Sequence, residues 1–117
     1  MTEYFNPQEC LDELHAKCKA IMAAKNHDYR GGSGDPYNNF RGSVSLGIDP
    51  IVGILLRVQD KLMRVRTFSD KGQLKVKGES IEDALIDVTN YMALIFGLVK
   101  EKQRGEDKED TAKETAV

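Results

Sequence analysis

GESIEDALIDVTNYMALIFGL, the stretch from Gly78 to Leu98, decides the fold that this sequence predicts. Its hydrophobic residues recur at three- and four-residue steps, which is the spacing of one face of an α-helix. That face consists of Ile81, Leu85, Val88, Met92, Ile95 and Val99. We therefore expect a long helix from about residue 79 to residue 102, with this face in the hydrophobic core.

A second face of the same stretch starts polar and ends hydrophobic. It runs through Glu79, Asp83, Asp87, Asn90 and Leu94. A solvated surface does not normally give way to a hydrophobic residue along one face. The acids are therefore expected to face inward, toward a cation, a basic helix or a phosphate-bound metal.

Carboxylates on successive helical turns can converge on a hard cation such as Mg²⁺, which then holds substrate phosphates. On this hypothesis Mg²⁺ is held by Glu79, Asp83 and Asp87, of which the two aspartates are catalytic. Asn90 adds a neutral oxygen ligand or contacts a sugar or a base. The alternative is that the aspartates pair with basic residues of another helix, and both arrangements can hold in one pocket.

The basic residues belong to a helix that Asp49-Pro50 predicts as a cap and first position, and that is expected to end near Phe68. They are Arg57, Lys61 and Arg64. Arginine offers a planar fork to phosphate oxygens and lysine a point charge. The alternative is a solvated face, or pairing with Asp60. The hydrophobic face of this helix is predicted to consist of Ile51, Ile54, Leu55, Val58, Leu62 and Val65.

A first helix is predicted from Pro7 to about Asn26, because Asn6 can cap it and proline suits its first position. Its hydrophobic face is expected to consist of Leu11, Leu14, Cys18 and Ile21. His15 also lies on this helix and is interpreted as structural.

The loop that follows, KNHDYRGGSGDPYNNF (residues 25–40), is glycine-rich at residues 30–35 and leads into a short helix that holds Phe40. It contains no GxxxxGK[ST] motif and follows no strand, so it is not a P-loop. Its aromatic rings can stack on a base or pin the loop onto the helices, and His27 is a candidate base. The candidate substrate-binding residues of this loop are Lys25, Asp28, Tyr29 and Asn39.

The 117 residues predict one all-α domain over residues 1–103, a bundle of three long helices and one short helix, followed by a flexible charged tail over 104–117. Three helices bury a limited core, so we expect a homo-oligomer. A net charge of −2 argues against binding of large nucleic acids. Cys10 and Cys18 lie two helical turns apart, too far for a disulfide, and are expected to be free thiols. With no predicted signal peptide or membrane span, the expected compartment is the cytoplasm.

Four separated blocks of the sequence resemble a known family. They are KNHDY (25–29), DPYNNF (35–40), R-x-x-DKLMR (57–64) and ESIEDALIDVTNYM (79–92). In this order they resemble the first "nucleotide modification associated domain" family of bacteria and phages, formerly a domain of unknown function. The resemblance implies a role in phage nucleotide metabolism and, for a phage-encoded chain, a location in the host cytoplasm.

A looser similarity is to the MazG-like all-α nucleoside triphosphate pyrophosphohydrolases. These helical bundles use an EExxE block and a later ExxD block to hold Mg²⁺ and activate water for attack at the α-phosphate. Asp87 matches the last acid, but Ala84 stands where the preceding glutamate is expected. The first block is only approximated, by Glu9, Asp12 and Glu13. These missing acids count against an inference of hydrolysis more than against an inference of nucleotide binding.

Two functions follow from these patterns. The first is metal-dependent hydrolysis of a nucleoside triphosphate or a related nucleotide. In this case the basic stripe, which consists of Arg57, Lys61 and Arg64, neutralises the phosphate charge. The alternative is a non-catalytic nucleotide-binding protein, which in a phage would sequester a linear or cyclic nucleotide signal of host defence. In either case we expect the pocket between the two later helices, under residues 25–41.

Overall fold

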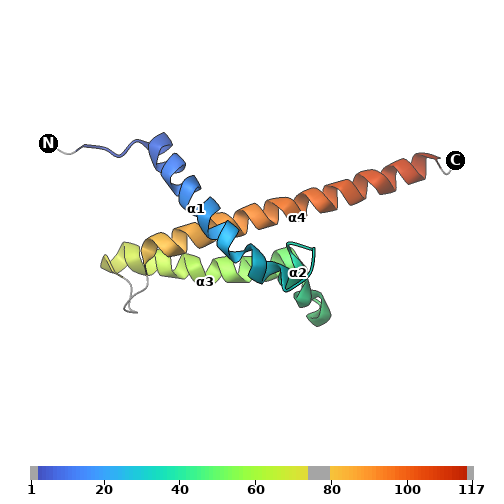
Figure 1. Ribbon diagram of the computed structural model, residues 1–117, viewed down its shortest axis with the longest axis horizontal. Helices are drawn as coiled ribbons and strands as arrows, with labels where there is room; N and C mark the ends of the chain where they lie inside the picture. Colours follow the sequence, from blue (N-terminus) through green and yellow to red (C-terminus); the bar gives the residue numbers. More distant parts are fainter. Residues whose placement is uncertain (1–2, 74–79, 116–117) are drawn as a thin grey trace.

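The computed structural model describes residues 3–73 and 80–115, with side chains as far as Glu106, and it is all-α. The described residues form α1 (Pro7–Arg30), α2 (Asn38–Arg41), the 3-10 helix η1 (Gly42–Leu46), α3 (Pro50–Lys71) and α4 (Ile81–Thr115). In Figure 1, α3 and α4 lie side by side as an antiparallel pair, and α1 crosses α4. This confirms the predicted bundle of three long helices and one short helix.

Short-range hydrogen bonds fix where the long helices begin. The Asn6 side chain accepts hydrogen bonds from two first-turn backbone N–H groups of α1, at 2.9 and 3.2 Å. The Asp49 side chain accepts one from Ile51 at 2.8 Å, and a proline follows each of these two caps. The Ser80 hydroxyl accepts the equivalent bond at the start of α4, from Glu82 at 3.1 Å. The predicted starts of α1 and α3 are therefore confirmed.

The end of α1 lies further along the chain than predicted. The helix continues to Arg30, so residues 25–30 of the expected loop form its last turns. Gly31 ends it with φ of 54°, a left-handed conformation that favours glycine. The hydrophobic pattern stops near Asn26 because the last turns are polar, whereas the backbone stays helical until the first glycine.

The other long helices also extend past their predicted ends. Instead of ending near Phe68, α3 reaches Lys71, where Gly72 caps it with φ of 71°. In place of an end near residue 102, α4 continues to Thr115, through most of the segment expected to be a flexible tail. No proline or glycine cap stands at residue 102 to stop it.

The hydrophobic core lies where α2 meets the α3–α4 pair. Its buried residues are Phe40, Ile54, Val58, Tyr91, Leu94 and Leu98. The side chains of Val88 and Ile95 pack against this core. Leu94 is therefore buried as expected at the end of the acidic face, and the short helix does hold Phe40 in place.

Part of the predicted core is wrong. On α4, Leu85, Met92 and Val99 are exposed by 43, 42 and 36%. Leu11, Leu55 and Leu62, on the other two long helices, are exposed as well. The physical reason is the position of α1, which packs on the side of α4 that carries the acids and leaves the expected core face bare.

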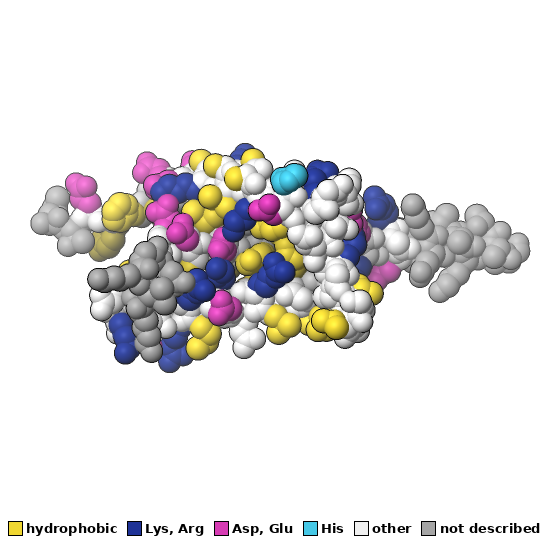
Figure 2. Space-filling view, turned by 60° about the horizontal axis from the view of Figure 1, so that its bottom comes forward, with side chains coloured by type: hydrophobic (Ala, Val, Ile, Leu, Met, Phe, Trp, Pro, Cys, Tyr) yellow, Lys and Arg dark blue, Asp and Glu magenta, His cyan; other side chains and the backbone are white. Residues whose placement is uncertain are grey.

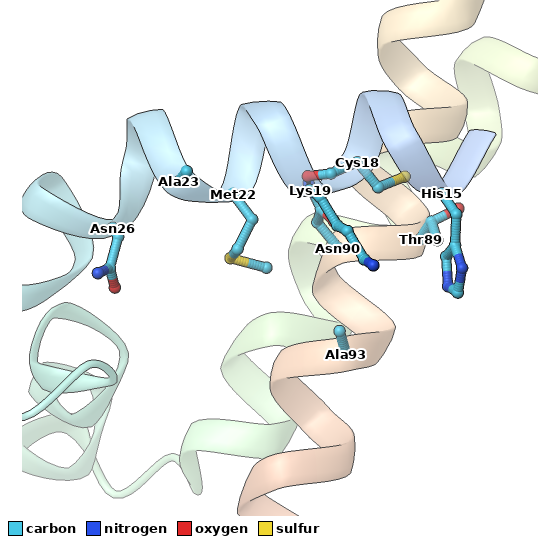
Figure 3. A pocket seen from close by; sticks show the side chains of 9 residues that line it. All are labelled: His15, Cys18, Lys19, Met22, Ala23, Asn26, Thr89, Asn90 and Ala93. Carbon is cyan, nitrogen blue, oxygen red and sulfur yellow. The ribbon is translucent and has the colours of Figure 1, made fainter. Parts of the chain in front are cut away.

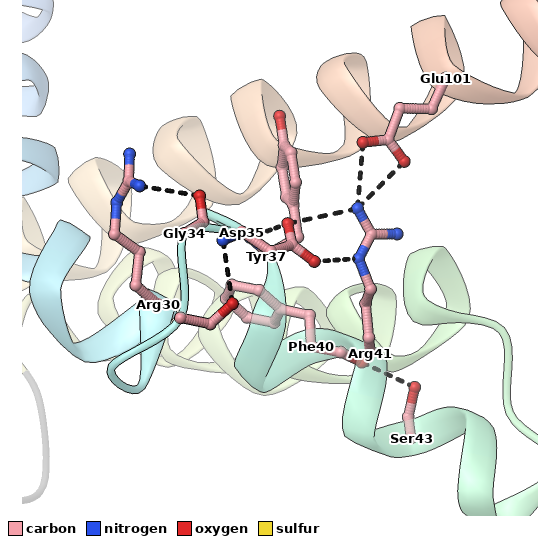
Figure 4. A network of polar contacts seen from close by, with 9 residues as sticks. Arg30, Gly34, Asp35, Tyr37, Phe40, Arg41, Ser43 and Glu101 are labelled. Atoms are coloured by element: carbon pink, nitrogen blue, oxygen red, sulfur yellow. Dashed lines mark hydrogen bonds and ion pairs between the residues drawn. The ribbon is translucent and has the colours of Figure 1, made fainter.

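A network of polar contacts ties the loop after α1 to α4 (Figure 4). The Arg41 side chain donates to the Asp35 carboxylate and, at 3.0 and 3.1 Å, to both oxygens of Glu101. Hydrogen bonds from Arg41 and from the Tyr37 backbone lower the pKa of Asp35 below its ordinary value. The Tyr37 ring lies under the Arg41 guanidinium and against Gly97, where a larger residue would force Tyr37 to shift.

Two other expectations concern the thiols and the membrane. Cys10 is exposed, Cys18 is buried, and both are free, as predicted. Within the described residues, no single helix is long and apolar enough to cross a membrane. The segments Asn38–Leu46 and Pro50–Lys71 reach that length and composition only together, as a pair bent by 103°.

Candidate functional site

Asp87 is the carboxylate at which α1, α3 and α4 meet. Its Oδ1 atom accepts a hydrogen bond from Lys25 Nζ of α1 at 3.2 Å, and its Oδ2 atom accepts one from Lys61 Nζ of α3 at 3.0 Å. The side chain of Asp87 is only 15% exposed and that of Lys61 only 19%. Both oxygens of one half-buried carboxylate are thus held by ammonium groups.

This pairing decides the protonation of the cluster. Burial by itself raises the pKa of Asp87, but the hydrogen bonds from Lys61 and Lys25 outweigh it, so the pKa lies below its ordinary value of 3.8. Burial by itself lowers the pKa of Lys25, and the hydrogen bond to Asp87 reverses this and raises the pKa overall. The carboxylate and Lys25 are therefore both charged at neutral pH.

Arg57 adds a third cation, one turn before Lys61 on α3. Its guanidinium carbon lies 4.9 Å from the centre of the Phe40 ring, which also contacts the Tyr29 ring at 5.0 Å between centroids. Burial raises the pKa of the Tyr29 hydroxyl, which therefore keeps its proton at neutral pH and can donate it. Two cations thus contact one half-buried carboxylate, and Arg57 lies one turn away from Lys61 on the same helix.

Asp83 lies one turn before Asp87 on α4 and is exposed. Both aspartates line an open cavity of about 290 Å³, whose other walls are Ile21, Lys25 and Ile86. Of these two acids, Asp87 contacts the predicted basic helix, through Lys61. Figure 2 shows a face of the molecule on which basic and acidic side chains lie next to one another in this way.

The structure separates the predicted basic stripe into different roles. Lys61 faces Asp87, Arg57 lies on an aromatic ring, and Arg64 lies 3.5 Å from Asp60, one turn away on α3. The predicted alternative of pairing across the helix interface thus holds for Lys61. The alternative of pairing with Asp60 holds for Arg64.

Four other residues with a predicted ligand-binding role make structural contacts, two through side-chain amides and two through aromatic rings. The Asn39 side chain donates to the backbone carbonyl of Asp28, which ties α2 to the end of α1. The Asn90 side chain is 6% exposed and donates to the backbone carbonyl of Cys18 at 3.1 Å, which joins α4 to α1. The rings of Tyr37 and Phe40 likewise hold the loop on the helices, and the burial of Phe40 leaves no face of it for a base.

Of the three predicted Mg²⁺ ligands, the structure describes Asp83 and Asp87. Glu79 lies outside the described residues. Among the residues that are described, no group of three or more His, Cys, Asp or Glu side chains is placed to hold a metal ion. On α1, Glu13 shares Lys17 with Glu82 of α4, at 3.3 and 2.6 Å, so this part of the expected first acid block is paired with a lysine.

A second cavity, of about 460 Å³, lies in the angle between α1 and α4 and is not indicated by any sequence pattern (Figure 3). It is lined by His15, Cys18, Lys19, Met22, Ala23, Asn26, Thr89, Asn90 and Ala93. The cavity exists because α1 crosses α4 at an angle and diverges from it. A crossing angle leaves no motif in the sequence, so the sequence pattern predicts only a structural role for His15 and Cys18.

A scan against protein-family models matched no family, and searches of curated proteins and of solved structures also gave no match. The resemblance to the nucleotide modification associated domain family stays a prediction. The function proposed below therefore depends on the geometry of the site.

Proposed function

We propose that this protein binds a nucleotide through its phosphates at Lys25, Arg57 and Lys61. The observation that carries the proposal is the Lys25–Asp87–Lys61 bridge, in which two lysines hold one half-buried carboxylate, with Arg57 one turn before Lys61 on α3. Charged groups in a half-buried site attract an anion more strongly than the same groups in bulk water.

Asp87 has a defined part in this proposal. With no ligand bound, its two oxygens hold the two lysines close together. A phosphate that approaches offers more oxygens and more negative charge, and it can share the lysines with Asp87. The guanidinium of Arg57 then supplies a planar fork to the same or the next phosphate.

Metal-dependent hydrolysis of the bound nucleotide is the second candidate. The observation that favours it is the cavity shared by Asp83 and Asp87 beside Lys25. Mg²⁺ would be held there by these carboxylates together with substrate phosphates, and the metal would supply the Lewis acid for attack by water. In that case Asp87 must release at least one lysine when metal and substrate bind.

One experiment separates the two candidates. Wild-type protein and the Lys61→Met and Asp87→Asn variants are titrated with linear and cyclic nucleotides, with and without Mg²⁺, and the nucleotides are identified after denaturation. Lys71→Met is the matched control, because it removes the same charge from an exposed position near the end of α3.

For a binding protein, intact nucleotide is recovered, Lys61→Met weakens binding by about tenfold or more, and Asp87→Asn keeps or tightens it because a competing carboxylate is gone. For a hydrolase, monophosphate and pyrophosphate appear with Mg²⁺ and are lost in Asp87→Asn. If no nucleotide raises the melting temperature of the wild-type protein, both candidates are wrong.

A further inference from the structure

One side of the α3–α4 pair is hydrophobic and open to solvent. We call this side the outer face; its residues are Val52, Leu55, Leu62, Leu85, Met92, Phe96 and Val99. Each of these side chains is exposed by 36–66%. Single exposed hydrophobic residues are normal on a protein surface, but a set that covers two adjacent helices is not.

The outer face points away from α1 and from the candidate site. On α4, Asn90 contacts α1, and Met92 follows two residues later, about 200° further around the helix. On α3, Lys61 points to Asp87, and Leu62 is the next residue, about 100° away on the side opposite Arg57. In Figure 1, α3 and α4 are antiparallel neighbours. Helical spacing places their exposed strips on the same side of this pair.

Most charged residues of α3 and α4 point away from this surface, and Lys100 lies at its edge, with Nζ 5.6 Å from the centre of the Phe96 ring. The charged side chains of α3 between Val52 and Leu62 are Arg57, Asp60 and Lys61, and they lie on the other side of the helix. The charged side chain of α4 between Leu85 and Val99 is Asp87, which faces Lys25 and Lys61. A hydrophobic patch with charges only at its edge is typical of a protein interface.

The size of the outer face fits a stable dimer. Seven half-exposed hydrophobic side chains and the atoms between them offer several hundred Å² per chain, on the order of the ~800 Å² per partner that a standard interface buries. Such a patch is at the upper limit of what monomers expose.

We propose that the outer face binds a second copy of this chain, so that two α3–α4 pairs pack together as a four-helix layer. Pairs of helices of similar length can pack ridges into grooves in this way. A two-fold contact uses the same patch on both copies. Both Lys25–Asp87–Lys61 sites then face outward and stay accessible.

Sedimentation equilibrium of the full chain tests the proposal, at chain concentrations from about 1 to about 100 µM. The wild-type protein is expected at twice the chain mass of 13.1 kDa. Met92→Glu and Leu62→Glu each place a carboxylate on the outer face, at positions that are exposed in the single chain and therefore compatible with its folding. Each is expected to raise the dimer dissociation constant by about 100-fold or more, because the charge would be buried without a partner.

Ala93→Glu is the matched control, because it adds the same charge to the next position of α4 but on the side of the α1 cavity. It is expected to stay dimeric, and circular dichroism reports whether each variant keeps its helices. A wild-type protein that is monomeric at the highest concentration overturns the proposal. So does a dimer that persists in both outer-face variants, which would place the contact elsewhere, and so does dissociation by Ala93→Glu to the same extent.

Discussion

Asp87 joins three helices through one carboxylate, so its removal leaves two lysines unpaired. We predict that Asp87→Asn lowers the free energy of unfolding at neutral pH by about 1–3 kcal/mol. Because the folded-state pKa of Asp87 lies below the ordinary value of 3.8, its contribution is complete above that pH and is lost as the pH falls through the folded-state pKa. The difference between variant and wild type should therefore shrink below pH 3.8, as measured by urea unfolding at a series of pH values.

Asp70→Asn serves as the control for this measurement. Asp70 pairs with Arg66 on the exposed surface of α3, where its side chain is 59% exposed. Surface pairs of this kind contribute little, so the change is expected within about 0.5 kcal/mol. A difference for Asp87→Asn that stays constant down to the lowest pH would contradict the role given to its charge.

The contact between Asp87 and Lys61 could be predicted from the sequence, but the contact between Asp87 and Lys25 could not. Helical spacing placed an acidic face and a basic face on neighbouring helices, and a short connection makes such helices antiparallel neighbours. The contribution of Lys25 depends on two features without a local signal: the extra turns of α1 and its crossing over α4. The structural role of Asn90 depends on the same crossing.

Among the elements, α4 offers a direct test of close packing at Gly97. A Cβ atom at this position would overlap the Tyr37 hydroxyl oxygen, whereas a Cβ at Gly105 of the same helix would meet nothing within 4 Å. Alanine favours a helix over glycine by about 1 kcal/mol at either position. We predict that Gly105→Ala stabilises the protein slightly, while Gly97→Ala destabilises it by about 1–2 kcal/mol because Tyr37 must move. Thermal and urea unfolding of the two variants measure the contrast, and equal effects would contradict it.

The contacts of Arg41 are expected to hold the loop between α1 and α2 in place. Lysine keeps the charge of Arg41 but cannot contact Asp35 and Glu101 with one planar fork. We predict that Arg41→Lys speeds amide hydrogen exchange in residues 31–37 and lowers the unfolding free energy by about 1 kcal/mol or less. Arg66→Lys, at a more exposed pair on α3, should leave the exchange of these residues unchanged. Equal exchange in both variants would show that the network does not hold the loop.

The helices themselves could be predicted because their signals are local. Proline after Asn6 and after Asp49 marks two helix starts within a few residues. The burial of each face could not be predicted in the same way. The hydrophobic strip with Leu85 and Met92 looks like a core face, since the spacing is identical whether a strip meets its own chain or stays bare.

For the whole molecule, the length of α4 separates a packed body from a projecting arm (Figure 1). The molecule extends 69 Å along its longest axis but only 33 and 26 Å along the others. The last described contacts between α4 and the rest of the chain are the pairs of Glu101 with Arg41 and of Lys102 with Asp49. The arm beyond them is helical to Thr115.

The arm is therefore expected to contribute little to the stability of the body. We predict that removing residues 106–117 changes the free energy of unfolding by no more than about 0.5 kcal/mol, because no described buried residue lies after Leu98. Urea unfolding of the shortened chain measures this. Since the outer face ends at Val99, the shortened chain should also stay dimeric in sedimentation equilibrium. A monomeric product would show that the arm, rather than the outer face, holds the two copies together.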